Sequence, residues 1–221
     1  MKFMKPRQSG FTLVEIAIVL VIIGLLLGGV LKGQEMIESA RIKSVVTDMN
    51  GIAAAYNTYF DRYHAIPGDE AAATYTGRGW TGTGNGNANG VLGISPAQTF
   101  TNGGEQPALW RALRNAGMTS GDILAPANAT GLPRAGTGGL IGVSVSPYGM
   151  PGPAVCVSGL STKQALGVDT TIDGALPTSN IGNNSGSARG DTGTAPATIA
   201  PVALAYNETV TITPWIMCRA F

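Results

Sequence analysis

An unbroken apolar run near the N-terminus constrains the fold of this chain more than any other feature of its sequence. Residues 16–31 carry no polar side chain, and within residues 11–31 the only polar side chains are those of Thr12 and Glu15. As an α-helix, these 21 residues would be about 31 Å long, which is close to the hydrocarbon thickness of a bilayer. The core helix of a globular domain is rarely this long and this apolar. The run therefore predicts a membrane-spanning helix.

The helical pattern continues past the apolar run and becomes amphipathic between residues 32 and 66. Apolar side chains recur there every three or four residues, which is the helical period, and charged side chains are available for the other faces. The apolar positions are Ile42, Val45, Met49, Ile52, Tyr56, Tyr59 and Tyr63. Pro67 and Gly68 end the pattern. We therefore predict one helix of roughly 50 residues, half in a membrane and half along a soluble domain, with the tyrosines at the seam.

The remaining residues, 67–221, have the composition of a domain with long loops. The chain has 32 Gly and 13 Pro but only 12% charged residues, whereas globular proteins usually carry about 25%. Short helices are predicted at 107–117 and 161–168. Strands are predicted at 139–149, 153–160, 202–206 and 208–218. Residues 179–198 are predicted to form a long loop without regular structure.

Two cysteines, Cys156 and Cys218, form an even pair in a chain with an export-like N-terminus. Such a pair is consistent with one disulfide in an oxidising compartment, which would tie the C-terminus back to the domain. Two separate buried thiols are the alternative that the sequence leaves open.

The N-terminal residues resemble those of type IV pilins and of the pseudopilins of type II secretion. A basic leader, residues 1–10, ends at Gly10, and Phe11 begins the apolar run, with Glu15 four residues later. In that family a prepilin peptidase cleaves after the glycine, and the new N-terminal residue, commonly Phe, is N-methylated. The resemblance therefore implies leader cleavage between Gly10 and Phe11, and N-methylation of Phe11.

The same resemblance implies a fold class and a domain organisation. The fold is expected to be α+β and pilin-like, with a long N-terminal helix packed on a small antiparallel sheet and with long Gly/Asn-rich loops. The expected parts are a leader (1–10), a transmembrane and filament-core helix (11–31), its amphipathic continuation (32–66) and a globular head (67–221). The chain departs from many major pilins in one respect, because the second half of its apolar segment has no proline. It has glycines instead, at Gly24, Gly28, Gly29 and Gly33.

Two roles are open to Glu15. A charged side chain at the centre of a membrane helix costs about 2.5–3.5 kcal/mol on insertion scales, but near a helix N-terminus the backbone N–H groups favour an anion. In the family, this glutamate is proposed to pair with the N-terminal amine of a neighbouring subunit, so that Glu15 would set the register during assembly. Capping of its own helix through Thr12 is the alternative.

The function that the resemblance implies is structural. The chain would be held in the inner membrane with its head in the periplasm, and would polymerise with itself or with other pilins into a pilus or pseudopilus. Its partners would be the prepilin peptidase and the inner-membrane assembly platform. Basic residues flank the apolar run almost equally, so only the N-terminal amine tips the positive-inside balance towards a cytoplasmic leader.

Two other organisations are alternatives to the filament subunit. A membrane-tethered periplasmic binding domain that does not polymerise is the main alternative, and it predicts an uncut N-terminus and a dispensable Glu15. A secreted protein with an ordinary signal peptide fits less well, because no small-residue cleavage site follows the apolar run.

Other kinds of site find little support in the sequence. His64 is the single histidine, which leaves little scope for a Ser-His-Asp or Cys-His arrangement, so no enzyme is expected. The Gly/Asn-rich residues 82–90 lack the Gly-Lys-Ser/Thr ending of a phosphate loop. Asp69–Glu70 and Asp169–Asp173 offer oxygen ligands that could serve calcium, and no other cofactor is expected. Nucleic acid is not an expected partner, since the chain has no clustered basic face.

Overall fold

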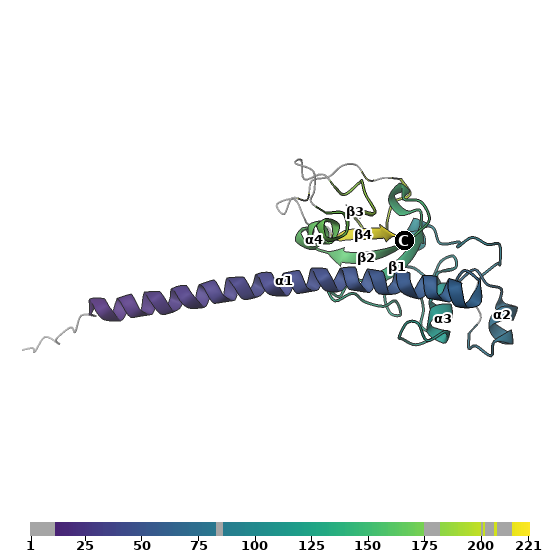
Figure 1. Cartoon of the computed structure of the whole chain (residues 1–221), viewed down its shortest axis with the longest axis horizontal. Helices are drawn as coiled ribbons and strands as arrows, with labels where there is room; N and C mark the ends of the chain where they lie inside the picture. Colours follow the sequence, from purple (N-terminus) through teal and green to yellow (C-terminus); the bar gives the residue numbers. More distant parts are fainter. Residues whose placement is uncertain (1–11, 83–85, 175–181, 200, 202–205, 207–213) are drawn as a thin grey trace, which may run out of the picture. The chain divides into compact units, whose positions relative to one another are not determined.

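The structure is a computed structural model that describes residues 12–82, 86–174, 182–199, 201, 206 and 214–221 (Figure 1). The elements in chain order are α1 (Leu13–Tyr63), α2 (Ala72–Gly77), η1 (Pro96–Gln98), α3 (Gln106–Asn115), β1 (Ile141–Val145), η2 (Pro147–Gly149), β2 (Pro153–Leu160), α4 (Thr162–Asp173), β3 (Ala188–Thr192) and β4 (Trp215–Ala220). The chain divides into two compact units, one up to Ala40 and one from Arg41 to Phe221.

Helix α1 is a single helix of 51 residues, so the predicted long helix is confirmed. No proline interrupts it, and an acid, Glu15, lies in its first turn while Arg62 lies in its last, as the helix dipole favours. The helix ends at Tyr63, and the next residue, His64, has a left-handed conformation (φ 51°) while its amide donates to the carbonyl of Phe60 at 2.8 Å. Pro67 follows three residues later.

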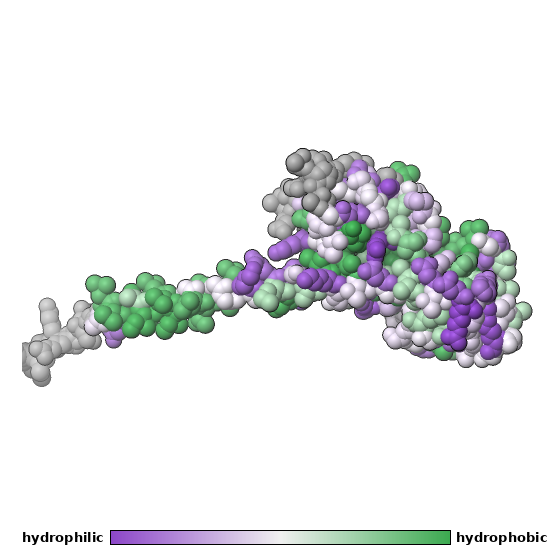
Figure 2. All heavy atoms as spheres, viewed as in Figure 1, coloured by the Kyte–Doolittle hydropathy of each residue, from purple (hydrophilic) through white to green (hydrophobic). Residues whose placement is uncertain are grey.

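In the first unit, α1 exposes apolar side chains on all sides. The large apolar residues between Leu13 and Leu31 are 46–87% exposed, and Figure 2 shows them as a continuous apolar surface. Among the described residues, α1 is the one helix that is long and apolar enough to cross a membrane. A soluble protein would have to bury such a surface, so this segment needs a cover from a bilayer or from other chains.

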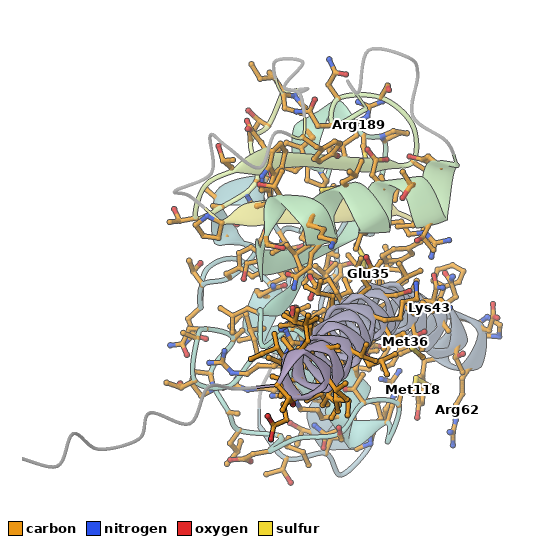
Figure 3. The ribbon with its side chains drawn as sticks, turned by 90° about the vertical axis from the view of Figure 1, so that its left-hand side faces the viewer. Glu35, Met36, Lys43, Arg62, Met118 and Arg189 are labelled. Atoms are coloured by element: carbon orange, nitrogen blue, oxygen red, sulfur yellow. A yellow bond between two sulfur atoms is a disulfide. The ribbon has the colours of Figure 1, made fainter. Side chains whose placement is uncertain are left out.

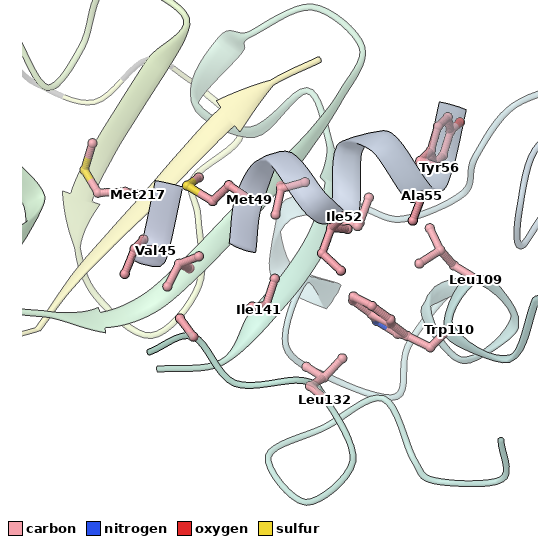
Figure 4. Close-up of a cluster of buried hydrophobic side chains, with 14 of the residues drawn as sticks. Val45, Met49, Ile52, Ala55, Tyr56, Leu109, Trp110, Leu132, Ile141 and Met217 are labelled. Atoms are coloured by element: carbon pink, nitrogen blue, oxygen red, sulfur yellow. The ribbon is translucent and has the colours of Figure 1, made fainter. Parts of the chain in front are cut away.

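In the second unit, one face of α1 forms the centre of the core. The buried positions are Val45, Met49, Ile52, Ala55, Tyr56 and Tyr59, which include five of the seven positions that the helical period predicts. They pack in one cluster with the sheet, with α4 and with α3. Figure 4 shows Leu109 and Trp110 of α3 in this cluster beside α1. The amphipathic pattern of the sequence therefore identified the face of α1 that meets the domain.

The four strands form one antiparallel sheet in the order β1-β2-β4-β3. Side chains alternate between its faces. Val143, Val155 and Met217 pack in the cluster with α1, whereas Cys156 and Ile216 pack in a second cluster under Tyr148 and Met150. Both faces are buried, and the predicted α+β class with a small antiparallel sheet is confirmed.

Predicted elements agree with the structure except in one stretch. The predicted helices at 107–117 and 161–168 correspond to α3 and α4, and β1 and β2 lie inside their predicted ranges. The prediction of an unstructured loop at 179–198 is wrong in part, because β3 lies inside it. Strand β4 includes the end of the predicted strand at 208–218, whose residues 208–213 fall outside the described residues. The predicted strand at 202–206 also falls outside them, except for Tyr206.

An ion pair and an aromatic group fix the end of α1 to the segment around α2. The Arg78 guanidinium donates to both carboxylate oxygens of Glu70 at 2.6 Å, and the Tyr59 hydroxyl donates to the same carboxylate. The guanidinium also lies over the rings of Tyr63 and Trp80, at 4.5 and 4.9 Å from their centroids. The predicted tyrosine seam is therefore present, and a cation completes it.

Candidate functional site

Glu15 caps the first turn of α1 through Thr12. The Thr12 backbone amide and hydroxyl both donate to Glu15 Oε2, at 2.9 and 2.8 Å, and the Glu15 amide donates to the Thr12 hydroxyl at 3.3 Å. These reciprocal bonds form a capping box, in which two backbone donors without partners in the helix become satisfied. The carboxylate is thus held at the N-terminal end of an exposed apolar helix, where the backbone field favours its charge.

The predicted processing site consists of Gly10 and Phe11 and is separate from Glu15. Gly10 and Phe11 lie outside the described residues, so the predicted cleavage and methylation remain predictions. Thr12, the first described residue, directly follows Phe11 in sequence. Glu15 is therefore the one predicted assembly residue whose surroundings the structure describes.

Four glycines in α1 have no role in the packing of the chain on itself. A Cβ atom placed on Gly24, Gly28, Gly29 or Gly33 would meet nothing within 4 Å, and α1 stays helical through all four. Each glycine costs about 1 kcal/mol relative to alanine inside a helix. Their spacing gives two pairs four residues apart, which is the arrangement that lets membrane helices approach each other closely.

A disulfide joins Cys156 of β2 to Cys218 of β4, so this prediction is confirmed. The two residues are direct cross-strand partners in the sheet, and both are completely buried. The bond spans 62 positions of sequence and ties the last strand to the centre of the sheet. It lies on the face of the sheet that is covered by Tyr148 and Met150.

The carboxylates that the sequence suggested for calcium each bind donors of the chain itself. Asp69 accepts from the amides of Asn89 and Gly90, and Glu70 pairs with Arg78. Asp169 accepts from the Tyr206 hydroxyl, whereas Asp173 accepts from the amides of residues 187 and 188. The described residues contain no group of three or more acidic, His or Cys side chains placed to hold a metal ion.

Nor do the described residues assemble a catalytic arrangement. His64 is exposed at the end of α1, and both cysteines are bonded to each other, which leaves no thiol to pair with it. A further buried carboxylate, that of Glu105, accepts from the amides of Asn87 and Gly93 and so organises the Gly/Asn-rich loop. Sequence reasoning missed Glu105 and Arg78, because their partners are backbone or distant side chains that no local pattern indicates.

Asp169 gives the head a pH-dependent stability. The residue is 1% exposed, and burial raises the pKa of its carboxyl from 3.8 to about 6. The hydrogen bond from Tyr206 lowers this pKa, whereas the negative charge of Asp173 raises it. Between these values the folded chain keeps a proton that the unfolded chain releases, so stability should fall as the pH rises from about 4 to 6. Asp169→Asn should reduce this pH-dependent loss of unfolding free energy by up to about 3 kcal/mol. Denaturant unfolding of the wild type and of Asp169→Asn, in detergent at pH 4 and pH 7, measures this difference. The same change in stability with pH in both proteins would contradict the prediction.

Comparison with known proteins finds a family motif in the N-terminal segment. Residues 5–31 match the family model described as the prokaryotic N-terminal methylation motif. The chain is also similar in structure to TcpA, a type IV pilin from Vibrio cholerae El Tor biotype, with a TM-score of 0.36 and 15% identity over 81% of this chain and 98% of that one. No curated protein matches the sequence. The chain thus carries a prokaryotic N-terminal methylation motif whose glutamate caps a long and exposed apolar helix.

Proposed function

We propose that this chain is a structural subunit, a pilin or pseudopilin, of a type IV pilus or a type II secretion pseudopilus. The observation that carries the proposal is the methylation motif at residues 5–31, which overlaps the exposed apolar half of α1. The motif supplies the processing signal, and the helix supplies a surface that only a bilayer or other chains can cover. The head, whose own core is complete, would then lie on the outside of the filament.

In this proposal the prepilin peptidase removes residues 1–10 and Phe11 is N-methylated. The chain is first anchored in the inner membrane by residues 11–31, with residues 32–66 continuing the helix and residues 67–221 forming a periplasmic head. An inner-membrane assembly platform then moves the helix out of the bilayer and into the filament. The neighbouring subunits there are copies of this chain or other pilins. The exposed glycine pairs, such as Gly24 and Gly28, support close helix packing in either setting.

Charge pairing is the reason why Glu15 belongs in the motif. Removal of the leader creates an amine at Phe11, and methylation leaves that amine cationic. A carboxylate and an amine in apolar surroundings attract each other strongly, because little water is present to screen them. Glu15 of one subunit would therefore neutralise the amine of the next subunit and fix its register.

The processing step is tested by Gly10→Val in cells that contain the peptidase. A peptidase must reach the backbone at the scissile bond, and a β-branched side chain beside it obstructs that approach. The wild-type chain should lack residues 1–10 and carry a methyl group on Phe11, whereas the variant should keep its leader and yield no filaments. Intact mass and N-terminal sequencing of the membrane-extracted proteins measure both results.

A wild-type chain that still begins at Met1 would remove the processing argument. The alternative, a periplasmic binding domain tethered by an uncut helix, would then explain the chain better. Detection of the disulfide in both proteins serves as the control that the variant head has folded and reached an oxidising compartment.

A further inference from the structure

A groove of about 430 Å³ opens on the second unit, between α1 and two loops of the head. Residues 47–52 of α1 form one side, and residues 118–120 and 133–134 form the other. Ile52, Met118 and Ile141 supply an apolar floor, while Asp48 and Arg134 place a charge of each sign in the lining. Such a mixed lining is suited to a helix that carries apolar and charged side chains on one face.

Two features of the groove have no explanation within the chain itself. A Cβ atom on Gly51 would meet nothing within 4 Å, so packing within the chain does not require a glycine in this lining position, although glycine costs about 1 kcal/mol in the middle of a helix. The Thr119 hydroxyl in the lining is buried without a hydrogen-bond partner among the described residues. Buried polar atoms normally have a partner, and none of the described residues supplies one here.

The chain carries a helical stripe of complementary chemistry. Lys32 and Glu35 form an ion pair at 3.0 Å on the exposed surface of α1, and Met36 beside them is 66% exposed (Glu35 and Met36 are labelled in Figure 3). These positions are i, i+3 and i+4, so they lie on one face of the helix. They follow the apolar segment 11–31, so a bilayer that covers the segment does not cover Met36.

We infer that the groove of one copy receives residues 32–36 of a second copy, an inference that rests on the proposed filament function. Met36 of the second copy lies on the apolar floor, Lys32 faces Asp48, and Glu35 faces Arg134. Copies enter the membrane in one orientation, so the two α1 helices run parallel.

A cysteine pair tests the contact in assembled filaments. Met36→Cys and Ser120→Cys place thiols on the stripe and on the rim of the groove, and both native cysteines are buried in a disulfide. Mild oxidation of filaments from the double variant should give a ladder of covalently linked chains on a non-reducing gel. Each single variant, treated alike, should give no ladder beyond a dimer.

Filling the groove tests its role from the other side. Gly51→Leu should leave the head at least as stable, since a Cβ atom at this position meets nothing within 4 Å and leucine favours a helix over glycine, and should reduce filament yield at least tenfold. Asn57→Leu adds the same exposed side chain to α1 away from the groove and should leave the yield unchanged. Sheared filaments quantified by immunoblot, with thermal unfolding of each variant, provide both readouts.

The outcomes separate the inference from the proposed function. Normal filaments without a ladder in the double variant, together with normal yield from Gly51→Leu, would overturn the inference and leave the filament function standing. Photo-cross-linking from position 120 to a different protein instead of a second copy would also overturn it. A wild-type chain that forms no filaments would overturn the proposed function, and the inference with it.

Discussion

Replacement of Glu15 by alanine should reduce filament yield by more than tenfold while the head remains folded. In the assembled state, loss of the carboxylate would leave the amine of a neighbouring Phe11 without a counter-charge in apolar surroundings. An uncompensated buried charge costs several kcal/mol, and the cost recurs at every subunit. Sheared filaments should therefore be nearly absent, and intact chains should remain in the membrane fraction, where immunoblotting of both fractions measures the ratio.

Two further variants separate the charge of Glu15 from its capping bonds. In the monomer the carboxylate accepts from the amide and the hydroxyl of Thr12, which a glutamine side-chain oxygen could also do. Glu15→Gln removes only the charge and should lose filaments as severely as Glu15→Ala. Thr12→Ala removes the hydroxyl of the capping box, keeps the charge and should leave assembly intact, although the first turn loses about 1 kcal/mol.

The opposite ranking would identify Glu15 as a helix cap and nothing more. If Glu15→Gln forms normal filaments and Thr12→Ala does not, the capping box is what assembly requires. The chain would then need another source of register between neighbours, for which the groove of residues 47–52 is a separate candidate.

The long helix was predictable because its determinants are local. An apolar run, a three-to-four-residue period and a Pro-Gly stop act through neighbouring residues, and the structure has α1 from Leu13 to Tyr63. The capping box of Thr12 and Glu15 was predictable for the same reason, since its partners are three residues apart. The buried face with Val45, Met49 and Ile52 followed from the period alone.

The elements that sequence reasoning missed depend on distant partners. Strand β3 has the sequence Ala-Arg-Gly-Asp-Thr, which carries no strand pattern, and it is a strand because it pairs with β4. Asp173 at the end of α4 supports it by accepting from the amides of Ser187 and Ala188. The groove beside Gly51 likewise arises where α1 meets loops that lie about 66 to 87 positions further along the chain.

Removal of the disulfide should lower the free energy of unfolding of the head by about 4 kcal/mol. The bond spans 62 positions, and a loop of that length restricts the unfolded chain by about this amount in the chain-entropy model. Domains are typically stable by only about 5–15 kcal/mol, so the loss is a large share of the total. Guanidinium unfolding of Cys156→Ala/Cys218→Ala, compared with the oxidised wild type, measures the difference.

The reduced wild-type chain is the matched control, because it keeps both sulfur atoms and loses only the bond. Both cysteines are completely buried beside Ile216 and Met150, so the alanine variant also loses packing. The reduced chain should therefore unfold between the oxidised wild type and the double variant. Equal midpoints for the oxidised and reduced wild type would contradict a stabilising role for the bond.

This dependence also bears on where the head folds. A cytosolic head would be kept reduced and would lack most of that stability, whereas a periplasmic head would gain it as the bond forms. Thiol alkylation in living cells, followed by denaturation, should therefore leave Cys156 and Cys218 unmodified in the wild type. If both thiols are modified before cell lysis, the head is not in an oxidising compartment, and the periplasmic orientation proposed for it fails.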